Sequence, residues 1–170
     1  MIARVLKLTL LGLAALALQG CFVSTEPLLK AAEADFPFSK LTFKSESKSV
    51  TLTRVGDLYK ILDDDDAPTY LFMKVDENLY IGQAAGKDKK GKLETVYGIV
   101  EHRGDRLEIR LPMCSDAGEA DLKAAGITKL DKWFVDQCQI TGLEQMKKLA
   151  LRIKDKDVQI QQFNIESITK

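Results

Sequence analysis

The stretch that decides the expected fold runs from Tyr70 to Ile81 and reads Tyr-Leu-Phe-Met-Lys-Val, Asp-Glu-Asn, Leu-Tyr-Ile. Its first part, Tyr70–Val75, is an apolar run rich in residues that favour β-strands, and Leu79–Ile81 is a second such run. The polar break between them, Asp76–Asn78, is as short as the turn of a β-hairpin. The sequence therefore predicts two antiparallel strands joined by a tight turn.

The segments on either side of this hairpin alternate between apolar and polar residues, with the period of two that is typical of strands. On the N-terminal side the alternation runs through Leu41–Phe43 and then Val50–Ile61. On the C-terminal side, Leu93–Val100 and Arg106–Leu111 form another predicted hairpin, which turns at His102–Asp105. Strands that follow one another in hairpin order are typical of an antiparallel meander.

Two helices are expected after the second hairpin. Asp116 and Glu119 have the spacing of a capping box for the first helix, and Gly126 stands where a helix-ending glycine is expected. Thr141 and Glu144 have the same spacing at the start of the second helix. The second helix carries one apolar stripe, formed by Leu143, Met146, Leu149, Ala150 and Ile153.

A final strand is expected over Val158–Ile165, where the alternation slips at Gln161-Gln162 and indicates a bulge. The predicted fold class is therefore α+β: an antiparallel β-meander of about six or seven strands, with two helices packed on one face.

The first residues of the chain have the features of a secretion signal. Arg4 and Lys7 supply positive charge, and the apolar run Leu8–Leu18 that follows is too short to span a bilayer. Leu18, Gln19, Gly20 and Cys21 end this run with an apolar residue, a small residue and a cysteine. This pattern resembles the lipobox of bacterial lipoproteins.

The resemblance implies cleavage before Cys21, a thioether-linked diacylglycerol on the sulfur of Cys21 and a third acyl chain on its amine. The lipid bilayer is then a partner of the chain through this residue. An ordinary signal peptide remains an alternative, because Ala15-Leu16-Ala17 also forms a small-x-small cleavage site.

The same resemblance sets the expected compartment and domain plan. Phe22 follows the cysteine, whereas the lipoprotein signal for retention in the inner membrane usually has Asp there. The expected location is therefore the periplasmic face of the outer membrane, with the inner membrane as the alternative. Residues 1–20 are the predicted signal peptide, 21–40 a lipidated tether and 41–170 a single periplasm-facing α+β domain.

The cysteines support the same interpretation. The chain has three, and lipidation of Cys21 leaves Cys114 and Cys138 as a pair in an oxidising compartment. Each of the two lies a few residues before a predicted helix. A disulfide between them is therefore expected, with two buried free thiols as the alternative.

Composition argues against several classes of function. The 25 basic and 25 acidic residues balance, so there is no electrostatic case for a nucleic-acid partner. Lipidation and pairing use all three cysteines, so no zinc site is expected, nor any other metal or cofactor. His102 is the only histidine, lies in a predicted turn and is expected to be exposed. No catalytic residue is predicted.

Two charged loops are candidate binding sites. Asp63–Asp66 fails the calcium-loop pattern, because the sixth position from Asp63 is Pro68 and the twelfth is Lys74. Lys87–Lys92 forms a basic loop that suits anionic lipid or glycan. A solvated loop without a ligand is the alternative for each.

The chain resembles the small lipoproteins of Gram-negative envelopes, without the motifs of a specific family. The expected function is a non-catalytic binding or assembly role in the bacterial envelope, with an envelope protein or glycan as partner. One alternative is an inhibitor of a cell-wall hydrolase such as lysozyme, acting through Lys87–Lys92. A second is a cell-wall hydrolase, although the chain has no G-x-S-x-G motif.

Overall fold

The computed structural model of the protein describes residues 22–45, 48–87, 91–110, 114–132, 135–156, 158 and 160–170. Strands dominate this part of the chain, and two short α-helices accompany them. The eleven described strands belong to one continuous sheet.

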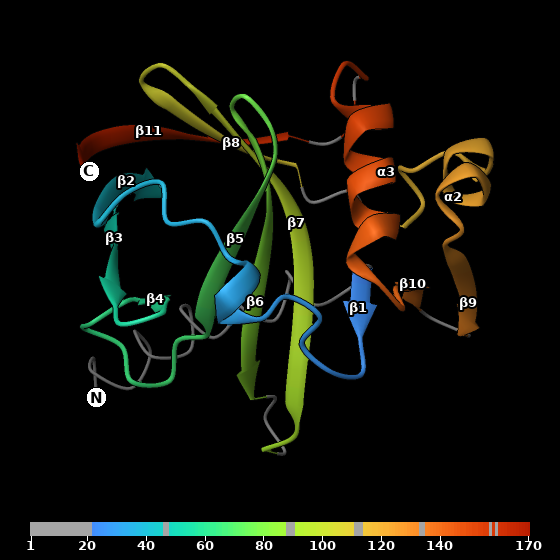
Figure 1. Ribbon diagram of the computed structural model, residues 1–170, viewed down its shortest axis with the longest axis horizontal. Coiled ribbons are helices and arrows are strands. Elements are labelled where there is room, and N and C mark those ends of the chain that lie inside the picture. The colour runs from blue at the N-terminus through green and yellow to red at the C-terminus, as the bar shows by residue number, and fades with distance from the viewer. Residues whose placement is uncertain are drawn as a thin grey trace, which may run out of the picture.

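Eight of these strands close into an antiparallel β-barrel (Figure 1). They follow the chain around the ring, and the last of them, β11, lies between β8 and β2 and so joins the two ends. The barrel strands are β2 (Lys40–Ser45), β3 (Lys48–Val55), β4 (Leu58–Lys60), β5 (Thr69–Asp76), β6 (Leu79–Lys87), β7 (Leu93–Arg103), β8 (Arg106–Arg110) and β11 (Ile160–Thr169).

The predicted fold class is therefore wrong: the chain forms a closed barrel and not an α+β meander with two helices on one face. The local pairings expected from the sequence are present, since Phe72 pairs with Gly82 and Ile99 with Arg110. The pairing of β11 with β2, in which Phe43 lies opposite Ile165, was not predicted from the sequence. Period-two alternation identifies the two faces of a strand but not its distant neighbours, so it does not reveal closure.

The barrel interior is filled by side chains. Tyr59 lies at its centre, with its ring centroid 4.5 Å from that of Phe38 and 5.4 Å from that of Phe72. A β-carbon added to Gly82 would lie 3.2 Å from a methyl carbon of Val100, so the wall leaves little room there. The buried residues of this first core are Phe38, Leu41, Phe43, Leu52, Tyr59, Phe72, Val100 and Leu107.

A second core lies on the outer face of β5, β6 and β7. There Met73 and Ile81 pack with the helix α3 (Leu143–Ile153), which contacts α2 (Glu119–Ala125) on its other side. The predicted apolar stripe of α3 is confirmed, because Met146, Leu149, Ala150 and Ile153 are all fully buried. Strand β5 is thus covered on both faces, which explains why Tyr70–Val75 is almost continuously apolar.

The sheet branches at β7. One edge of β7 pairs with β8 along Ile99–Arg103 and with a separate strand, β1 (Phe22–Ser24), along Thr95–Tyr97. From β1 the sheet continues through β10 (Val135–Gln139) to β9 (Thr128–Lys132). This small side sheet lies outside the ring (Figure 1).

The helix boundaries differ in detail from those expected. The capping residues are Gly118 and Gly142, neither of which has a side chain to form a cap. Instead of capping the helix through its own side chain, Thr141 donates its backbone N–H to the Gln145 side chain at 2.8 Å. Gly126 does end α2, with a left-handed φ of 71°. The irregularity in β11 lies between Ile165 and Ser167, and not at Gln161-Gln162.

Candidate functional site

The best candidate site is the N-terminal segment that would join the acyl chains to the barrel. Cys21, the predicted lipidation residue, lies outside the described residues. Phe22, directly after it, is fully buried. It pairs with Tyr97 of β7 on one edge and with Cys138 of β10 on the other. The backbone next to Cys21 is therefore part of the sheet.

Two polar side chains of the barrel wall hold the continuation of this segment. The Gln83 side-chain amide accepts a hydrogen bond from the Leu29 N–H at 2.8 Å and donates one to the Leu29 carbonyl at 3.0 Å. The Tyr97 hydroxyl accepts the Leu28 N–H at 2.8 Å, donates to Gln83 at 3.0 Å and lies 3.0 Å from the Ser24 hydroxyl. We call Gln83 and Tyr97 the latch.

The latch belongs to the second core and not to a solvent-filled site. Burial raises the pKa of the Tyr97 phenol, with smaller opposing effects from its contacts with Ser24 and Leu28. Because the hydroxyl stays neutral, it acts as a hydrogen-bonding group and not as an acid or base near neutral pH. Buried polar groups that are all paired in this way specify one position for the segment they bind.

The rest of the segment reaches the first core. The edge of β5 is left open by the short strand β4, which pairs with β5 only at Tyr59 and Tyr70. Asp35 covers this edge: its N–H donates to the Phe72 carbonyl at 2.8 Å, and its carboxylate accepts the Lys74 N–H at 2.6 Å. Asp35 follows η1 (Ala31–Glu33), a single 3₁₀ turn.

Phe36 and Phe38 complete the attachment of this segment. Phe38 enters the barrel interior, and its carbonyl accepts a hydrogen bond from the Tyr59 hydroxyl at 2.6 Å. The Arg54 guanidinium lies over the ring of Phe36, 3.8 Å from the ring centre. Residues 22–40, expected from the sequence as a tether, thus contact both cores.

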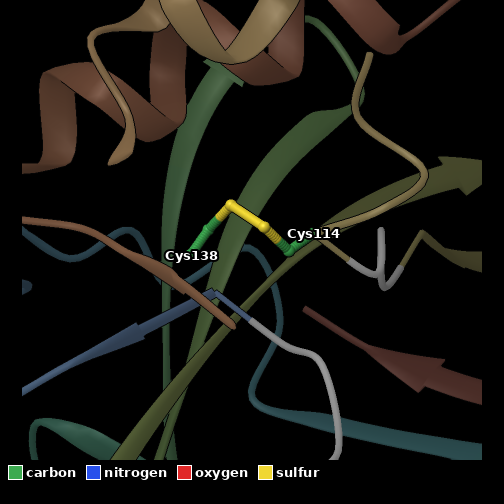
Figure 2. The surroundings of a disulfide bond; sticks show 2 residues. All are labelled: Cys114 and Cys138. Atoms are coloured by element: carbon green, nitrogen blue, oxygen red, sulfur yellow. A yellow bond between two sulfur atoms is a disulfide. The ribbon is translucent and has the colours of Figure 1, made fainter. Parts of the chain in front are cut away.

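The predicted disulfide between Cys114 and Cys138 is confirmed (Figure 2). The two α-carbons are 5.4 Å apart, and the residues are 1% and 0% exposed. The bond ties the segment after β8 to β10, the strand that pairs with Phe22. It therefore supports the side sheet to which the N-terminal segment belongs.

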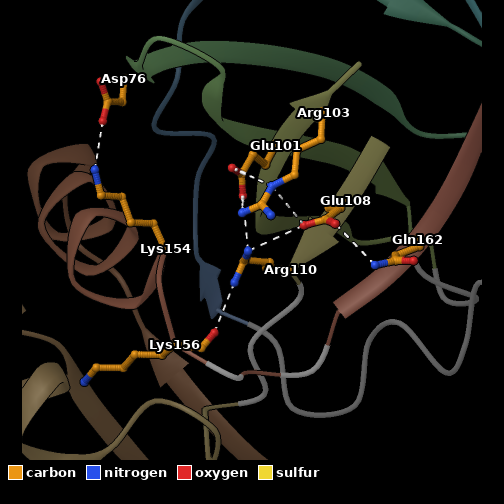
Figure 3. A network of polar contacts seen from close by, with 8 residues as sticks. All are labelled: Asp76, Glu101, Arg103, Glu108, Arg110, Lys154, Lys156 and Gln162. Atoms are coloured by element: carbon orange, nitrogen blue, oxygen red, sulfur yellow. Dashed lines mark hydrogen bonds and ion pairs between the residues drawn. The ribbon is translucent and has the colours of Figure 1, made fainter. Parts of the chain in front are cut away.

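A charged cluster, formed by Glu101, Arg103, Glu108 and Arg110, lies on the outer face of β7 and β8 (Figure 3). Arg110 is almost fully buried and places one terminal nitrogen 3.2 Å from Glu101 and 3.5 Å from Glu108. Arg103 approaches the same two carboxylates at 2.9 and 3.5 Å. The hydrogen bond and charge of Glu101 raise the pKa of Arg103.

This cluster is suited to a structural role. Two carboxylates face two guanidinium groups, so the charges within the cluster balance. The other terminal nitrogen of Arg110 donates to the Lys156 carbonyl at 3.1 Å and so binds the turn after α3. The Arg110 Nε is buried without a hydrogen-bond partner among the described residues.

Three further ion pairs, formed by the two carboxylates of Asp76 and Asp121, hold the end of α3 and the turn after it. Lys154 lies 3.1 Å from Asp76, and the Glu77 N–H together with Lys154 lowers the pKa of the Asp76 carboxyl (Figure 3). Asp121 of α2 contacts both Lys156 and Arg152, the latter at 3.0 Å, and these two cations lower its pKa.

The other candidates from the sequence are not brought together. His102 is half-buried rather than exposed, and its Nε2 has no hydrogen-bond partner within the described chain. In the acidic loop, Asp64 accepts the Asp66 N–H at 3.1 Å, so it supports its own turn. Lys87 ends β6, but part of the basic loop, residues 88–90, lies outside the description.

The described residues contain no group of three or more His, Cys, Asp or Glu side chains placed to hold a metal ion. No helix within them is long and apolar enough to cross a bilayer.

An open hollow of about 530 Å³ lies between the barrel and the start of α3. Its lining comprises Leu28, Glu33, Met73, Gly142, Leu143, Glu144 and Lys147.

Sequence reasoning missed the latch and the charged cluster. The latch and the charged cluster share one signal in the sequence. In each, a polar or charged residue occupies a strand position whose side chain points toward a covered face. Gln83 continues the buried series of Leu79 and Ile81, while Glu108 and Arg110 share one face of β8. Alternation alone does not show that this outer face is covered by other elements.

Comparison of the chain with protein-family models, with curated proteins and with solved structures finds no match.

Proposed function

We propose that this protein is a non-catalytic lipoprotein of the bacterial envelope, anchored through acyl chains on Cys21, with a binding or assembly role. The observation that carries the proposal is the burial of Phe22 in β1, directly after the lipobox cysteine. The residue that bears the acyl chains is thereby joined to a strand that is paired on both edges. Such a link holds the barrel against the membrane surface without a flexible spacer.

The chemistry at Cys21 needs a membrane glycerophospholipid and water as co-reactants. The Cys21 sulfur attacks the terminal glycerol carbon of the diacylglyceryl group, a carbon–sulfur bond forms, and the bond to the phosphate oxygen breaks. The thiol proton passes to the departing phosphate. Water then hydrolyses the peptide bond between Gly20 and Cys21. Each buried CH₂ of the acyl chains contributes about 0.8 kcal/mol, so two or more chains anchor the protein stably.

Metabolic labelling tests the anchor. Cells that express the full chain are fed a fatty acid bearing an alkyne, and the protein is purified and coupled to a fluorophore. We expect label on the wild type and none on Cys21→Ser, while Cys114→Ser, a matched control, keeps the label. Equal labelling of wild type and Cys21→Ser contradicts the proposal.

A binding role is supported by the way the barrel is built. Its interior is packed with aromatic and aliphatic side chains, so the outer surface is the part that can meet a partner. In-cell crosslinking followed by purification from the envelope tests this. A specific protein or glycan recovered with wild type, and lost when the anchor residue is changed, supports membrane-localised assembly.

One observation favours the alternative of a hydrolase inhibitor. The β6–β7 hairpin continues past the last pairing of β5, at Thr69 and Ala85, with Gly86 opposite Glu94 and Lys87 opposite Leu93. Leu93 is 49% exposed, so an apolar side chain stands beside a basic one on this arm. Purified domain added to lysozyme in a cell-wall clearing assay tests this, and inhibition that Lys87→Glu weakens would support the inhibitor.

A further inference from the structure

We infer that Cys21 is acylated and the signal peptide removed while β1 is undocked from the barrel, and that docking of β1 completes the fold afterwards. This inference rests on the proposed function, since it concerns the order of the reactions at Cys21. It follows from three properties of the described residues next to that cysteine.

The first property is that β1 is paired on both edges at Phe22 and Val23. Phe22, Val23 and Ser24 pair with β7, and the same strand pairs with β10 on its other side. The Val23 carbonyl also accepts the Ile140 N–H at 3.0 Å. A peptidase binds the residues around its scissile bond in an extended form through their backbone groups. In the docked state, the residues from Phe22 onwards have already used these groups.

The second property is burial. Phe22 is fully buried in the second core with Cys138 and Tyr97, so its side chain is not accessible to an enzyme. A few residues further on, the latch binds the backbone at Leu28 and Leu29. An enzyme that needs Phe22 would have to break the β1 pairings and draw this side chain out of the core.

The third property is that the barrel closes without β1. The ring consists of β2 to β8 and β11, and among the described strands β1 pairs only with one edge of β7 and with β10 of the side sheet. The latch residues Gln83 and Tyr97 belong to ring strands, so they are in place before the segment arrives. A state with a closed barrel and a free N-terminal segment is therefore compatible with the topology.

A processing assay on the full precursor tests this order. Precursor in detergent is mixed with membranes that contain lipoprotein-processing enzymes, either refolded or freshly diluted from denaturant. Mass spectrometry follows the added diacylglyceryl group and the loss of residues 1–20. We expect the refolded precursor to be processed at least about tenfold more slowly, because enzymes act on the rare conformers in which β1 is undocked.

Two matched variants show whether docking is the cause. Tyr97→Phe removes the latch hydroxyl and should speed processing of the refolded precursor, with no effect on the diluted one. Tyr80→Phe, the same change on an inward-facing residue of β6, should leave both rates as in wild type. Circular dichroism verifies that both variants fold.

The outcomes separate this inference from the proposed function. Equal rates for refolded and diluted wild-type precursor overturn the order proposed here and leave lipidation intact. Unchanged processing of refolded Tyr97→Phe also overturns it, since the latch would not limit access. If neither form of the precursor is processed, Cys21 is not a substrate and the proposed function fails with it.

Discussion

Phe22 lies beside Cys138 in the parallel pairing of β1 with β10, and the sulfur of Cys138 is bonded to Cys114. The first described residue of the chain thus pairs with the strand that the disulfide holds in place. Loss of the disulfide should therefore affect the attachment of the N-terminal segment as well as the global stability.

Removal of the disulfide should destabilise the domain strongly. The two cysteines are 24 positions apart in sequence. The chain-entropy estimate for closing such a loop is roughly 3.5 kcal/mol. We expect the free energy of unfolding of the double variant Cys114→Ala, Cys138→Ala to fall by about this amount in urea denaturation. Reduced wild type is the control, and a loss below about 1 kcal/mol would contradict the estimate.

The apolar stripe of α3 should be the most sensitive part of the helix. Leu149 is fully buried, whereas Leu151, two residues further on, is 47% exposed. We expect Leu149→Ala to cost about 2 to 5 kcal/mol. Leu151→Ala, the same change on the exposed face, should cost less than about 0.5 kcal/mol. Similar midpoints of urea denaturation for the two variants would show that the stripe is not core.

The start of α3 should depend on Gln145 more than on Thr141. The Gln145 side chain accepts the Thr141 N–H and also donates to the Gly126 carbonyl, so it joins both helices. We expect Gln145→Ala to cost about 1 to 2 kcal/mol for two hydrogen bonds. Thr141→Ala keeps the backbone N–H and should cost less. A larger loss for Thr141→Ala in thermal or chemical unfolding would restore the threonine cap predicted from the sequence.

Acid should weaken the contact between α2 and α3. The pKa of Asp121 is lowered in the folded state by Lys156 and Arg152, so the unfolded chain binds a proton there more readily. The stabilisation is therefore present above the unfolded pKa, about 3.9, and is lost as pH falls through the lower folded pKa. Melting temperatures of wild type and Asp121→Asn should differ at pH 7 and converge below about pH 3. If the difference in melting temperature between the two proteins does not change with pH, the ion pairs of Asp121 do not contribute to the stability in this way.

The sequence by itself determined the local structure of this protein. The hairpin from Tyr70 to Ile81 and the stripe of α3 could be read from periodicity, because side-chain direction repeats every two residues in a strand and about every 3.6 in a helix. The Cys114–Cys138 bond followed from the number of cysteines and from the oxidising compartment that the resemblance to a lipobox implies. Each of these depends on residues near in sequence or on simple counting.

Only the tertiary structure decided which distant segments became neighbours. Strands pair through backbone groups that every residue carries, so the sequence of β11 does not identify β2 as its partner. The same limit hid the branch at β7 and the docking of residues 22–40, where Asp35 fills a gap left by a short strand. Gln83 looked like an ordinary polar residue until the fold placed Leu29 against it, because a buried amide requires a partner and only the packed chain supplies one.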